Sequence, residues 1–415
     1  MTSIREIEGS TRPGSALDNL QSQPADPLLG LMGAFKADAR AHKIDLGLGV
    51  YRDEGGSTPV LKAVKAAERF LLETQDSKSY LGPEGDAGFA KCLVSVIFGP
   101  SAAAVRAAGI QTPGGCGALR TAGELIAKAN PGGRIHIGTP SWPNHFSILR
   151  AAGLEIVEYC YFDPTTQQIC FDQLMAALEG ASIGDAVLLH ACCHNPSGAD
   201  LSHEQWSEVI SVLVERNLLP LVDFAYHGLG RGLEPDASAM RRLAEQCPAL
   251  LLAYSCDKNF GLYRDRAGVL YVLGRDIDQT AVVLSNVLAI TRANWSMPPD
   301  HGAAVVRTIL ESDELASLWR SELAAMQMRV SGLRADLAKS APCFAPLATQ
   351  NGFFSQLHLS PESIADLRAR EAIYMAGNGR INIAGLNTIA LSRFSKATAP
   401  LLTEGPPHQA KAKGG

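Results

Sequence analysis

The sequence predicts an α/β fold in which a large domain with a mostly parallel sheet, flanked by helices, stands beside a smaller α/β domain. Short apolar runs alternate along the chain with helix-like stretches, which is the pattern of a parallel sheet with helical crossovers. No internal repeat breaks this alternation. The chain has 415 residues, of which 46% are hydrophobic and 19% charged, so it is long enough for two globular domains.

The individual elements follow from the same pattern. Apolar runs of strand length, bounded by turn residues, are taken as strands, and longer periodic stretches as helices. The predicted strands are 134–138, 186–190, 219–223, 250–254 and 268–272. The predicted helices include 58–75, 117–129, 202–216 and 311–340, the last of them long and amphipathic.

Both ends of the chain have too few apolar residues to order themselves, so residues 1–16 and 403–415 are predicted to be disordered. The N-terminal residues lack the apolar core of a signal peptide, and no window approaches eighteen uninterrupted apolar residues. Nine scattered cysteines suit a reducing compartment. We therefore expect a cytoplasmic protein that does not bind a membrane.

The charge of the chain argues against nucleic acid as a partner. The net charge is -5, the pI is near 6.1, and no cluster of lysine and arginine lies on a helical stripe. We expect no nucleic-acid binding.

Polar and aromatic residues gather where the predicted strands end. In an open parallel sheet, ligands bind at the carboxyl ends of the strands. Residues that follow different strands can therefore converge on one site. They are Trp142, His145, Asn195, Asp223, Tyr226 and Lys258.

The turn Gly114–Gly117 comes before a predicted helix and offers backbone N–H groups at a helix N-terminus, where anions bind. Taken alone, this turn is better explained as a tight loop without a ligand. Ser255, Arg266 and Tyr80 add further donors, and a phosphate dianion needs several charge-assisted hydrogen bonds in one place. Together these residues predict a phosphate site.

Asp223 ends the apolar run LLPLVDFAY, where an unpaired polar group costs about 2 to 7 kcal/mol and a charge costs more. Its partner is either a structural cation or the protonated ring nitrogen of a ligand. Lys258, in a mostly buried site near Arg266, is expected to be a neutral nucleophile that can form an imine with an aldehyde.

Phosphate, protonated pyridine and imine are the three points by which a protein holds pyridoxal 5'-phosphate (PLP), which we predict as the cofactor. Trp142 would stack on the ring, and Asn195 and Tyr226 would hydrogen-bond its phenolic oxygen. No metal is expected, because Cys192, Cys193 and His194 lack the spacing of zinc ligands.

From about Ala25 to Leu386 the chain resembles the aspartate/aromatic amino-acid aminotransferases, the class I group of fold-type I PLP-dependent transferases. The motifs that carry the resemblance are, in order, ADPLLGL, IDLGLGVYRDEGG, SYLGPEG, QTPGGCGALR, PSWPNHFSI, LLHACCHNPSGADL, DFAYHGLGRGL, KNFGLYRDRAG, TRANWSMPP and GRINIAGL.

The resemblance implies that Lys258 binds the cofactor aldehyde and moves the proton between the substrate Cα and C4' of the cofactor. It implies that Asp223, supported by His145, pairs with the pyridine nitrogen, and that Tyr226 is the third catalytic residue. The other implied cofactor contacts are Gly115, Cys116, Trp142, Asn195, Ser255, Arg266 and, from the other subunit of a homodimer, Tyr80.

For the substrate, the resemblance implies that Arg380 grips the α-carboxylate as a bidentate fork. Arg292 of the other subunit would meet the distal carboxylate of a dicarboxylic substrate. Gly49, Trp142 and Asn195 complete the implied substrate site. The implied reaction has two half-reactions, in which an amino acid leaves its amino group on PLP and 2-oxoglutarate then takes it, with ping-pong kinetics. The implied partners are amino acids, 2-oxo acids and a second copy of the chain.

The expected domain boundaries follow from the same resemblance. Residues 17–55 would form an N-terminal arm and part of the small domain. Residues 56–325 would form the large PLP-binding domain, and residues 326–402 the small C-terminal domain.

Four residues depart from the family pattern. Cys116 stands where a hydroxyl residue is usual, and Asp257 stands beside the lysine where a small or hydroxyl residue is usual. Met297 replaces a common Asn, and Gln356 occupies a position that is often aromatic or Arg. These departures leave the implied cofactor residues in place and put the substrate in question.

The substrate prediction favours aromatic amino acids, with acidic ones also accepted, because Met297, SMPP and GNGRINIAGLN resemble the broad-range bacterial enzymes. An aspartate-specific aminotransferase is the close alternative. A PLP lyase and a PLP-binding protein without catalysis are two further alternatives. Arg292 and Arg380 argue against the last, because a scaffold needs no clamps for substrate carboxylates.

Overall fold

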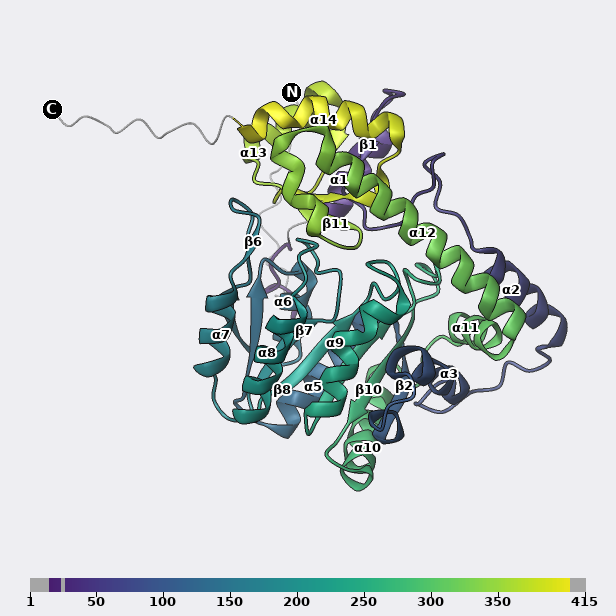
Figure 1. The fold of residues 1–415 in the computed structure, drawn as a ribbon. Coiled ribbons are helices and arrows are strands. Elements are labelled where there is room, and N and C mark those ends of the chain that lie inside the picture. The colour runs from purple at the N-terminus through teal and green to yellow at the C-terminus, as the bar shows by residue number, and fades with distance from the viewer. Residues whose placement is uncertain (1–14, 24–26, 404–415) are drawn as a thin grey trace, which may run out of the picture.

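The computed structural model describes residues 15–23 and 27–403 of the chain (Figure 1). Most of the predicted disordered segment 1–16 and all of the tail beyond residue 403 lie outside the described residues. None of the described helices is long and apolar enough to cross a membrane.

A seven-stranded sheet forms the centre of the larger part of the molecule. Every neighbouring pair of strands is parallel except the two pairs that involve β10, which runs antiparallel to both of its neighbours. In spatial order the strands are β2 (Ala107–Pro113), β10 (Ala267–Leu273), β9 (Leu250–Ser255), β8 (Leu219–Phe224), β7 (Ala186–His190), β3 (Arg134–Thr139) and β4 (Glu155–Cys160). The predicted α/β fold with a mostly parallel sheet is confirmed.

Helices cover both faces of the sheet, and successive residues of a strand point to opposite faces, so both sets of side chains are buried. In β9, Leu250, Leu252 and Tyr254 belong to one apolar core and Leu251 and Ala253 to the other. Helices α5 (Gly114–Ala129), α6 (Pro143–Ala151) and α10 (Ile277–Asn294) pack on one face. On the other face lie α3 (Ala87–Phe98), α7 (Phe171–Glu179), α8 (His203–Glu215) and α9 (Leu233–Gln246). The result is a three-layer arrangement (Figure 1).

The smaller part of the molecule contains two short sheets and the C-terminal helices. Strand β1 (Ile44–Asp45) pairs with β12 (Ile373–Tyr374), and β11 (Phe354–Gln356) pairs with β13 (Arg380–Asn382). The remaining elements of this part are α1 (Pro27–Ala37), η1 (Pro342–Thr349), α13 (Pro361–Glu371), η2 (Ile383–Gly385) and α14 (Thr388–Thr403). Segments from both ends of the chain therefore build it together.

The long helix α12 (Asp313–Ser340) joins the two parts (Figure 1). Near its start it packs with α2 (Lys62–Thr74) and α11 (His301–Glu311), and near its end with α14 and η1. The predicted domain boundary at residues 325 and 326 falls inside this helix. The elements not yet named are α4 (Ala103–Arg106), β5 (Phe162–Asp163) and β6 (Gln168–Ile169).

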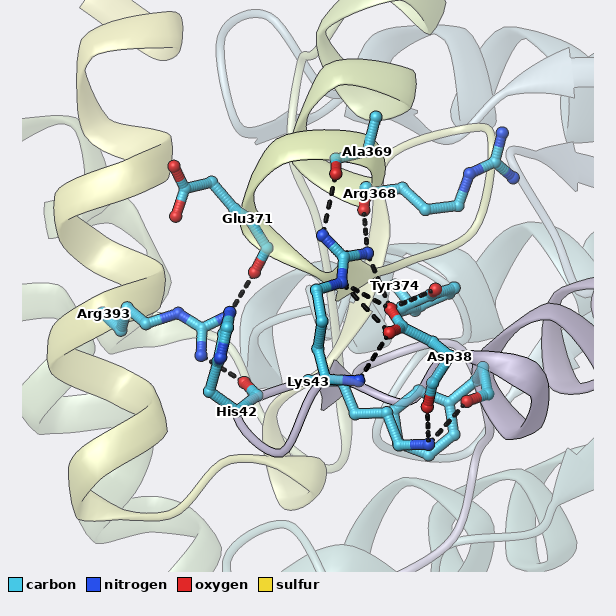
Figure 2. Close-up of polar contacts among 10 residues, drawn as sticks. Asp38, His42, Lys43, Arg368, Ala369, Glu371, Tyr374 and Arg393 are labelled. Atoms are coloured by element: carbon cyan, nitrogen blue, oxygen red, sulfur yellow. Dashed lines mark hydrogen bonds and ion pairs between the residues drawn. The ribbon is translucent and has the colours of Figure 1, made fainter.

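Arginine side chains fasten the N-terminal segment to the end of α13 (Figure 2). The last carbonyls of a helix have no partner within it. Arg40 donates to the carbonyl oxygens of Arg368 and Ala369 at 3.0 and 2.7 Å, and its guanidinium is held by Asp38, which also accepts from the Tyr374 hydroxyl at 2.7 Å. This network fixes the start of β1 and hence the segment that follows it.

Candidate active site

A cavity of about 230 Å³ lies at the carboxyl ends of the central strands, between the two parts of the molecule. Both parts contribute to its wall. The lining residues are Leu28, Gly49, Gly115, Cys116, Leu119, Trp142, Asn195, Asp223, Ala225, Tyr226, Ser255, Asp257, Lys258, Arg266, Phe354 and Arg380. The predicted site residues that do not line it are His145, Tyr80 and Arg292.

The sheet explains why these residues meet. Asp223 is near the end of β8, Ser255 is the last residue of β9, and Lys258 follows three residues later. Asn195 lies in the loop after β7, and Trp142 is the N-cap of α6 after β3. Neighbouring parallel strands end at the same edge, so residues far apart in the sequence surround one cavity.

Asp223 is held by a buried histidine. Its Oδ2 lies 2.9 Å from Nε2 of His145, whose Nδ1 lies 2.8 Å from the Ser141 hydroxyl. His145 is fully buried behind Asp223, so it supports the carboxylate and does not line the cavity. Burial by itself would raise the pKa of Asp223, but the hydrogen bond from His145 and nearby positive charges, including Lys258, lower that pKa below its ordinary value. The cavity therefore contains an ionised carboxylate.

The amine of Lys258 lies inside the cavity, close to an acid and an aromatic ring. Its Nζ is 3.9 Å from Oδ2 of Asp257 and 5.6 Å from the centre of the Tyr226 ring. The side chain of Lys258 is 21% exposed, so the amine can be reached from the cavity. A partly buried primary amine is a nucleophile suited to a carbonyl group.

The first turn of α5 and the residues around Arg266 form an anion cup. Gly114–Gly117 were expected to precede the helix but form its first turn. A Cβ atom on Gly114 would lie 2.5 Å from Nη2 of Arg266, so only glycine lets the helix start approach this arginine so closely. Ser255 and Cys116 complete the cup. Unpaired N–H groups of a helix start and a guanidinium together suit a phosphate.

Cys116 adds no negative charge to this cup. Burial raises the pKa of its thiol above the ordinary value, although the neighbouring positive charge of Arg266 acts in the opposite direction. The thiol is therefore neutral at pH 7 and does not repel an anion.

Arg380 brings a second cation to the cavity from β13. Arg380 is 4% exposed; its guanidinium donates from Nη2 to the carbonyl of Gly47 at 2.8 Å and lies 4.4 Å from the centre of the Phe354 ring. Its Nη1 is 3.4 Å from Oδ1 of Asn195, a long hydrogen bond, and its Nε has no partner among the described residues. A buried guanidinium with a free donor is suited to a carboxylate ligand.

The segment around Gly49 is held against this arginine. Asn382 donates to the carbonyls of Leu48 and Val50 at 2.7 and 2.8 Å. A Cβ atom on Gly49 would lie 2.7 Å from Cζ of Phe354, which explains the glycine. Phe354 and Leu28 are lining residues that the sequence analysis missed. The motifs GFFSQLHL and ADPLLGL contain them, but nothing in the spacing shows that they face the cavity.

Tyr80 and Arg292 lie away from the cavity. Tyr80 is 93% exposed, and Arg292, in the last turn of α10, is also exposed and donates to the hydroxyl of Ser296. The two belong to one region of the surface, because the backbone N–H of Leu81 contacts the sulfur of Met297 at 3.0 Å. Gln356 is not among the residues that line the cavity, and its side chain donates to the carbonyl of Asn378 at 3.0 Å.

Two buried groups have the residue types of metal ligands: His145, His190 and Asp223 in one, and Cys192, Cys193 and Asp236 in the other. In the second, Asp236 already accepts hydrogen bonds from three backbone N–H groups. Burial raises the pKa of the Cys193 thiol to about 12, so it is not a thiolate at pH 7. In the first group only Asp223 lines the described cavity, and its Oδ2 is already in contact with Nε2 of His145.

The fold and the cavity define an α/β enzyme with an anion site at the ends of its strands. Comparison with known proteins identifies its family. Residues 41–397 match the sequence model of the family described as aminotransferase class I and II. The chain belongs to this family and is an aminotransferase.

Individual relatives agree with this assignment. The chain is 52% identical over 376 residues to a tyrosine aminotransferase of Rhizobium meliloti, covering 89% of this chain and 96% of the relative. It is 42% identical over 394 residues to an aspartate aminotransferase of Escherichia coli, covering 93% and 100%. A solved structure of an aromatic-amino-acid aminotransferase from Burkholderia pseudomallei, covalently bound to pyridoxal phosphate, superimposes with a TM-score of 0.91 at 37% identity, covering 94% and 100%.

Proposed function

We propose that this aminotransferase uses PLP to move the amino group of an aromatic or acidic L-amino acid to 2-oxoglutarate by a ping-pong mechanism. The observation that carries the proposal is the convergence of the Lys258 amine, the ionised Asp223 and the Arg266 cup in one cavity. These are the groups that an aldehyde, a pyridinium and a phosphate require. The Burkholderia relative, covalently bound to pyridoxal phosphate, supports the same cofactor.

Each residue has one task in this proposal. PLP, when bound, supplies an electron sink for the carbanion formed at the substrate Cα. Lys258 holds the cofactor covalently and, once released, carries the proton from the substrate Cα to C4' of the cofactor. Asp223, positioned by His145, keeps the ring nitrogen protonated because a buried carboxylate stabilises a cation beside it.

The remaining cofactor residues hold the ring and the phosphate in place. Trp142 offers a flat face for the ring. Asn195 and Tyr226 offer hydrogen bonds to the phenolic oxygen. The phosphate is assigned to Gly115, Cys116, Ser255 and Arg266, together with Tyr80 of a second copy of the chain.

Substrate recognition is assigned to the two arginines. Arg380 has a free donor and a fixed guanidinium plane, which suits the α-carboxylate common to all amino acids. The exposed positions of Arg292 and Tyr80 support a homodimer in which each copy completes the other's site, and Arg292 would meet the distal carboxylate there. Gly49 lies in the segment that covers the substrate.

The proposal favours aromatic over strictly acidic donors. The tyrosine aminotransferase of Rhizobium meliloti shares 52% of residues with this chain, against 42% for the aspartate aminotransferase of Escherichia coli. Met297, in place of a polar residue, makes the region near Arg292 less polar. An aspartate-specific enzyme is the second candidate, since Arg292 is retained. A cytoplasmic location remains a prediction.

The test is covalent trapping of the cofactor. Purified protein is incubated with PLP, reduced with sodium borohydride, digested and analysed by peptide mass spectrometry, with Lys258→Arg as the control. We expect the pyridoxyl mass on Lys258 and none in the control. A label on another lysine, or no label, would refute the assignment. If the protein instead released pyruvate and ammonia from an amino acid with no 2-oxo acid added as acceptor, it would be a lyase.

A further inference from the structure

The carboxyl group of Asp257 lies in the anion cup itself. Asp257 is 2% exposed and lines the cavity beside Lys258. Its Oδ2 forms an ion pair with Nη1 of Arg266, the arginine that faces the first turn of α5. Oδ2 is also 3.3 Å from the position that a Cβ on Gly114 would occupy, so this acid approaches the start of the helix closely.

The other oxygen of the carboxyl group has no hydrogen-bond partner among the described residues. This oxygen, Oδ1 of Asp257, is buried. Leaving a buried charged acceptor unpaired is unfavourable by about 1 to 3 kcal/mol or more. The cavity that this residue lines is the place from which a partner can come, and the partner must bring a hydrogen to Oδ1 or accept one from it.

The charges around Asp257 make a full phosphate dianion a poor partner. The titratable groups that face it are Lys258, Arg266, Cys116, Cys256 and Tyr263. Burial raises the pKa of Asp257 against the lowering effect of Lys258 and Arg266. A phosphate ester above its second pKa carries about two negative charges. Arg266 would then face two anions at once.

We propose that Asp257 and the phosphate group of the cofactor share one proton across Oδ1. Binding joins the ester dianion, the Asp257 carboxylate and one proton from solvent, so that a single O–H···O hydrogen bond replaces two repelling anions, and no other bond forms or breaks. The inference rests on the proposed PLP function of the same site. It makes Asp257 a cofactor-binding residue whose contribution depends on pH.

A shared proton predicts that the affinity for the phosphate ester falls as the pH rises. The free ester loses its second proton near pH 6. Above that pH the free ester is a dianion, so the complex has to take its shared proton from solvent. The dissociation constant of the ester then rises by up to about tenfold for each unit of pH. A serine at position 257 would present a hydroxyl donor to the dianion and would need no proton. Its affinity for the ester should then stay nearly constant between pH 7 and 8.5.

The experiment uses pyridoxamine 5'-phosphate, which has no aldehyde and so cannot react with Lys258. Isothermal titration calorimetry of the purified full-length protein is performed at pH 8 in buffers of different ionisation enthalpy. The dependence of the binding heat on that enthalpy gives the number of protons taken up on binding. The wild type is compared with Asp257→Ser and with Asp257→Asn, which keeps the shape of the side chain. We expect the wild type to take up about one proton more than either variant, and its dissociation constant to rise with pH more steeply.

Equal proton uptake in the wild type and the variants would overturn the proposal. If one of the two variants does not fold, the other decides, because the difference in uptake between wild type and variant cancels the protons that the ring nitrogen and Lys258 gain or lose on binding. Absence of pyridoxamine phosphate binding to every protein would refute the cofactor assignment itself, and this inference with it. Binding with equal uptake refutes only the role of Asp257.

Discussion

Oδ2 of Asp223 lies 2.9 Å from Nε2 of His145 at the floor of the cavity, and the Ser141 hydroxyl lies 2.8 Å from the other ring nitrogen. The histidine is fully buried, so this chain of contacts fixes the carboxylate from behind and leaves its cavity side for a ligand. The arrangement keeps Asp223 charged in a site where burial alone would favour the neutral acid.

Replacing Asp223 with Asn should lower kcat/KM by about 10²- to 10³-fold or more, because a neutral amide cannot hold the proton on the ring nitrogen of the cofactor. The measurement is steady-state transamination with PLP in excess. Asp236→Asn is the matched control, because Asp236 is a buried carboxylate outside the cavity that accepts from the backbone N–H groups of Gly228, Gly230 and Arg231. Activity in Asp223→Asn as high as in the control would remove Asp223 from the chemistry.

Arg380→Ala should raise KM for every amino acid, because a charged hydrogen-bonding partner of the α-carboxylate contributes about 1.5 to 3 kcal/mol, which corresponds to about 10- to 150-fold. Arg334→Ala is the control. Arg334 is equally buried but donates to Ser355 and to the carbonyls of Gly352 and Phe354. The control should lower the free energy of unfolding with a smaller change in KM. An unchanged KM in Arg380→Ala would contradict the assignment.

Arg292→Ala should weaken aspartate and glutamate far more than phenylalanine and tyrosine, because only acidic substrates have a distal carboxylate to bind. The measurement is kcat/KM for the four substrates in parallel. Arg275→Ala is the control, because Arg275 is another exposed arginine, and it pairs with the neighbouring Asp276. An equal loss for both classes of substrate would exclude Arg292 from the distal pocket.

Acid should destabilise the fold through His227. This buried ring has Nε2 2.8 Å from the Leu233 carbonyl and Nδ1 3.0 Å from the Tyr254 hydroxyl, and burial lowers its pKa from 6.5 to about 4. Because the folded-state pKa is depressed, the contribution of His227 to stability is complete above pH 6.5 and is lost as the pH falls toward about 4.

At pH 5 this loss amounts to about 2 kcal/mol relative to pH 7.5. Denaturant unfolding at the two pH values, for wild type and His227→Gln, measures it. The variant should show a smaller difference between the two pH values, whereas the exposed His203→Gln should behave as the wild type. An identical pH effect in wild type and His227→Gln would show that this ring is not the sensitive group.

The strands and their polar ends could be predicted from the sequence because local signals define them. The predicted strand 186–190 coincides with β7, and Asp223 and Lys258 lie at strand ends as expected. The apolar run and the charged residue after it are both local, so they are visible without tertiary information.

Helix ends were less predictable because tertiary contacts set them. The helix expected from residue 58 begins at Lys62, where the carboxylate of Glu322 in α12 accepts from the N–H groups of Lys62 and Ala63 at 2.8 and 3.0 Å. The helix expected over 311–340 begins at Asp313, because Ser312 caps it by accepting from the N–H of Leu315. A Ser before Asp and Glu is a local capping signal that was missed.

Part of the cavity wall also depends on tertiary contacts that the local sequence does not reveal. Phe354 meets Arg380 because β11 and β13 pair, with Gln356 opposite Arg380. Such a pairing between distant segments has no signature in the spacing of residues. Tyr80 and Arg292 are exposed in the single chain, so their roles rest on the proposed homodimer and not on contacts that one chain shows.

The most direct test of the central claim is the isolated half-reaction. The purified protein with bound PLP is mixed with aspartate, glutamate, phenylalanine, tyrosine or tryptophan singly, and the absorbance of the lysine-bound cofactor is followed without any 2-oxo acid. We predict conversion to pyridoxamine phosphate with one equivalent of 2-oxo acid per site, fastest with an aromatic donor. Faster conversion with aspartate alone would favour the aspartate-specific enzyme, and failure of every amino acid to convert the bound cofactor would contradict transamination at this site.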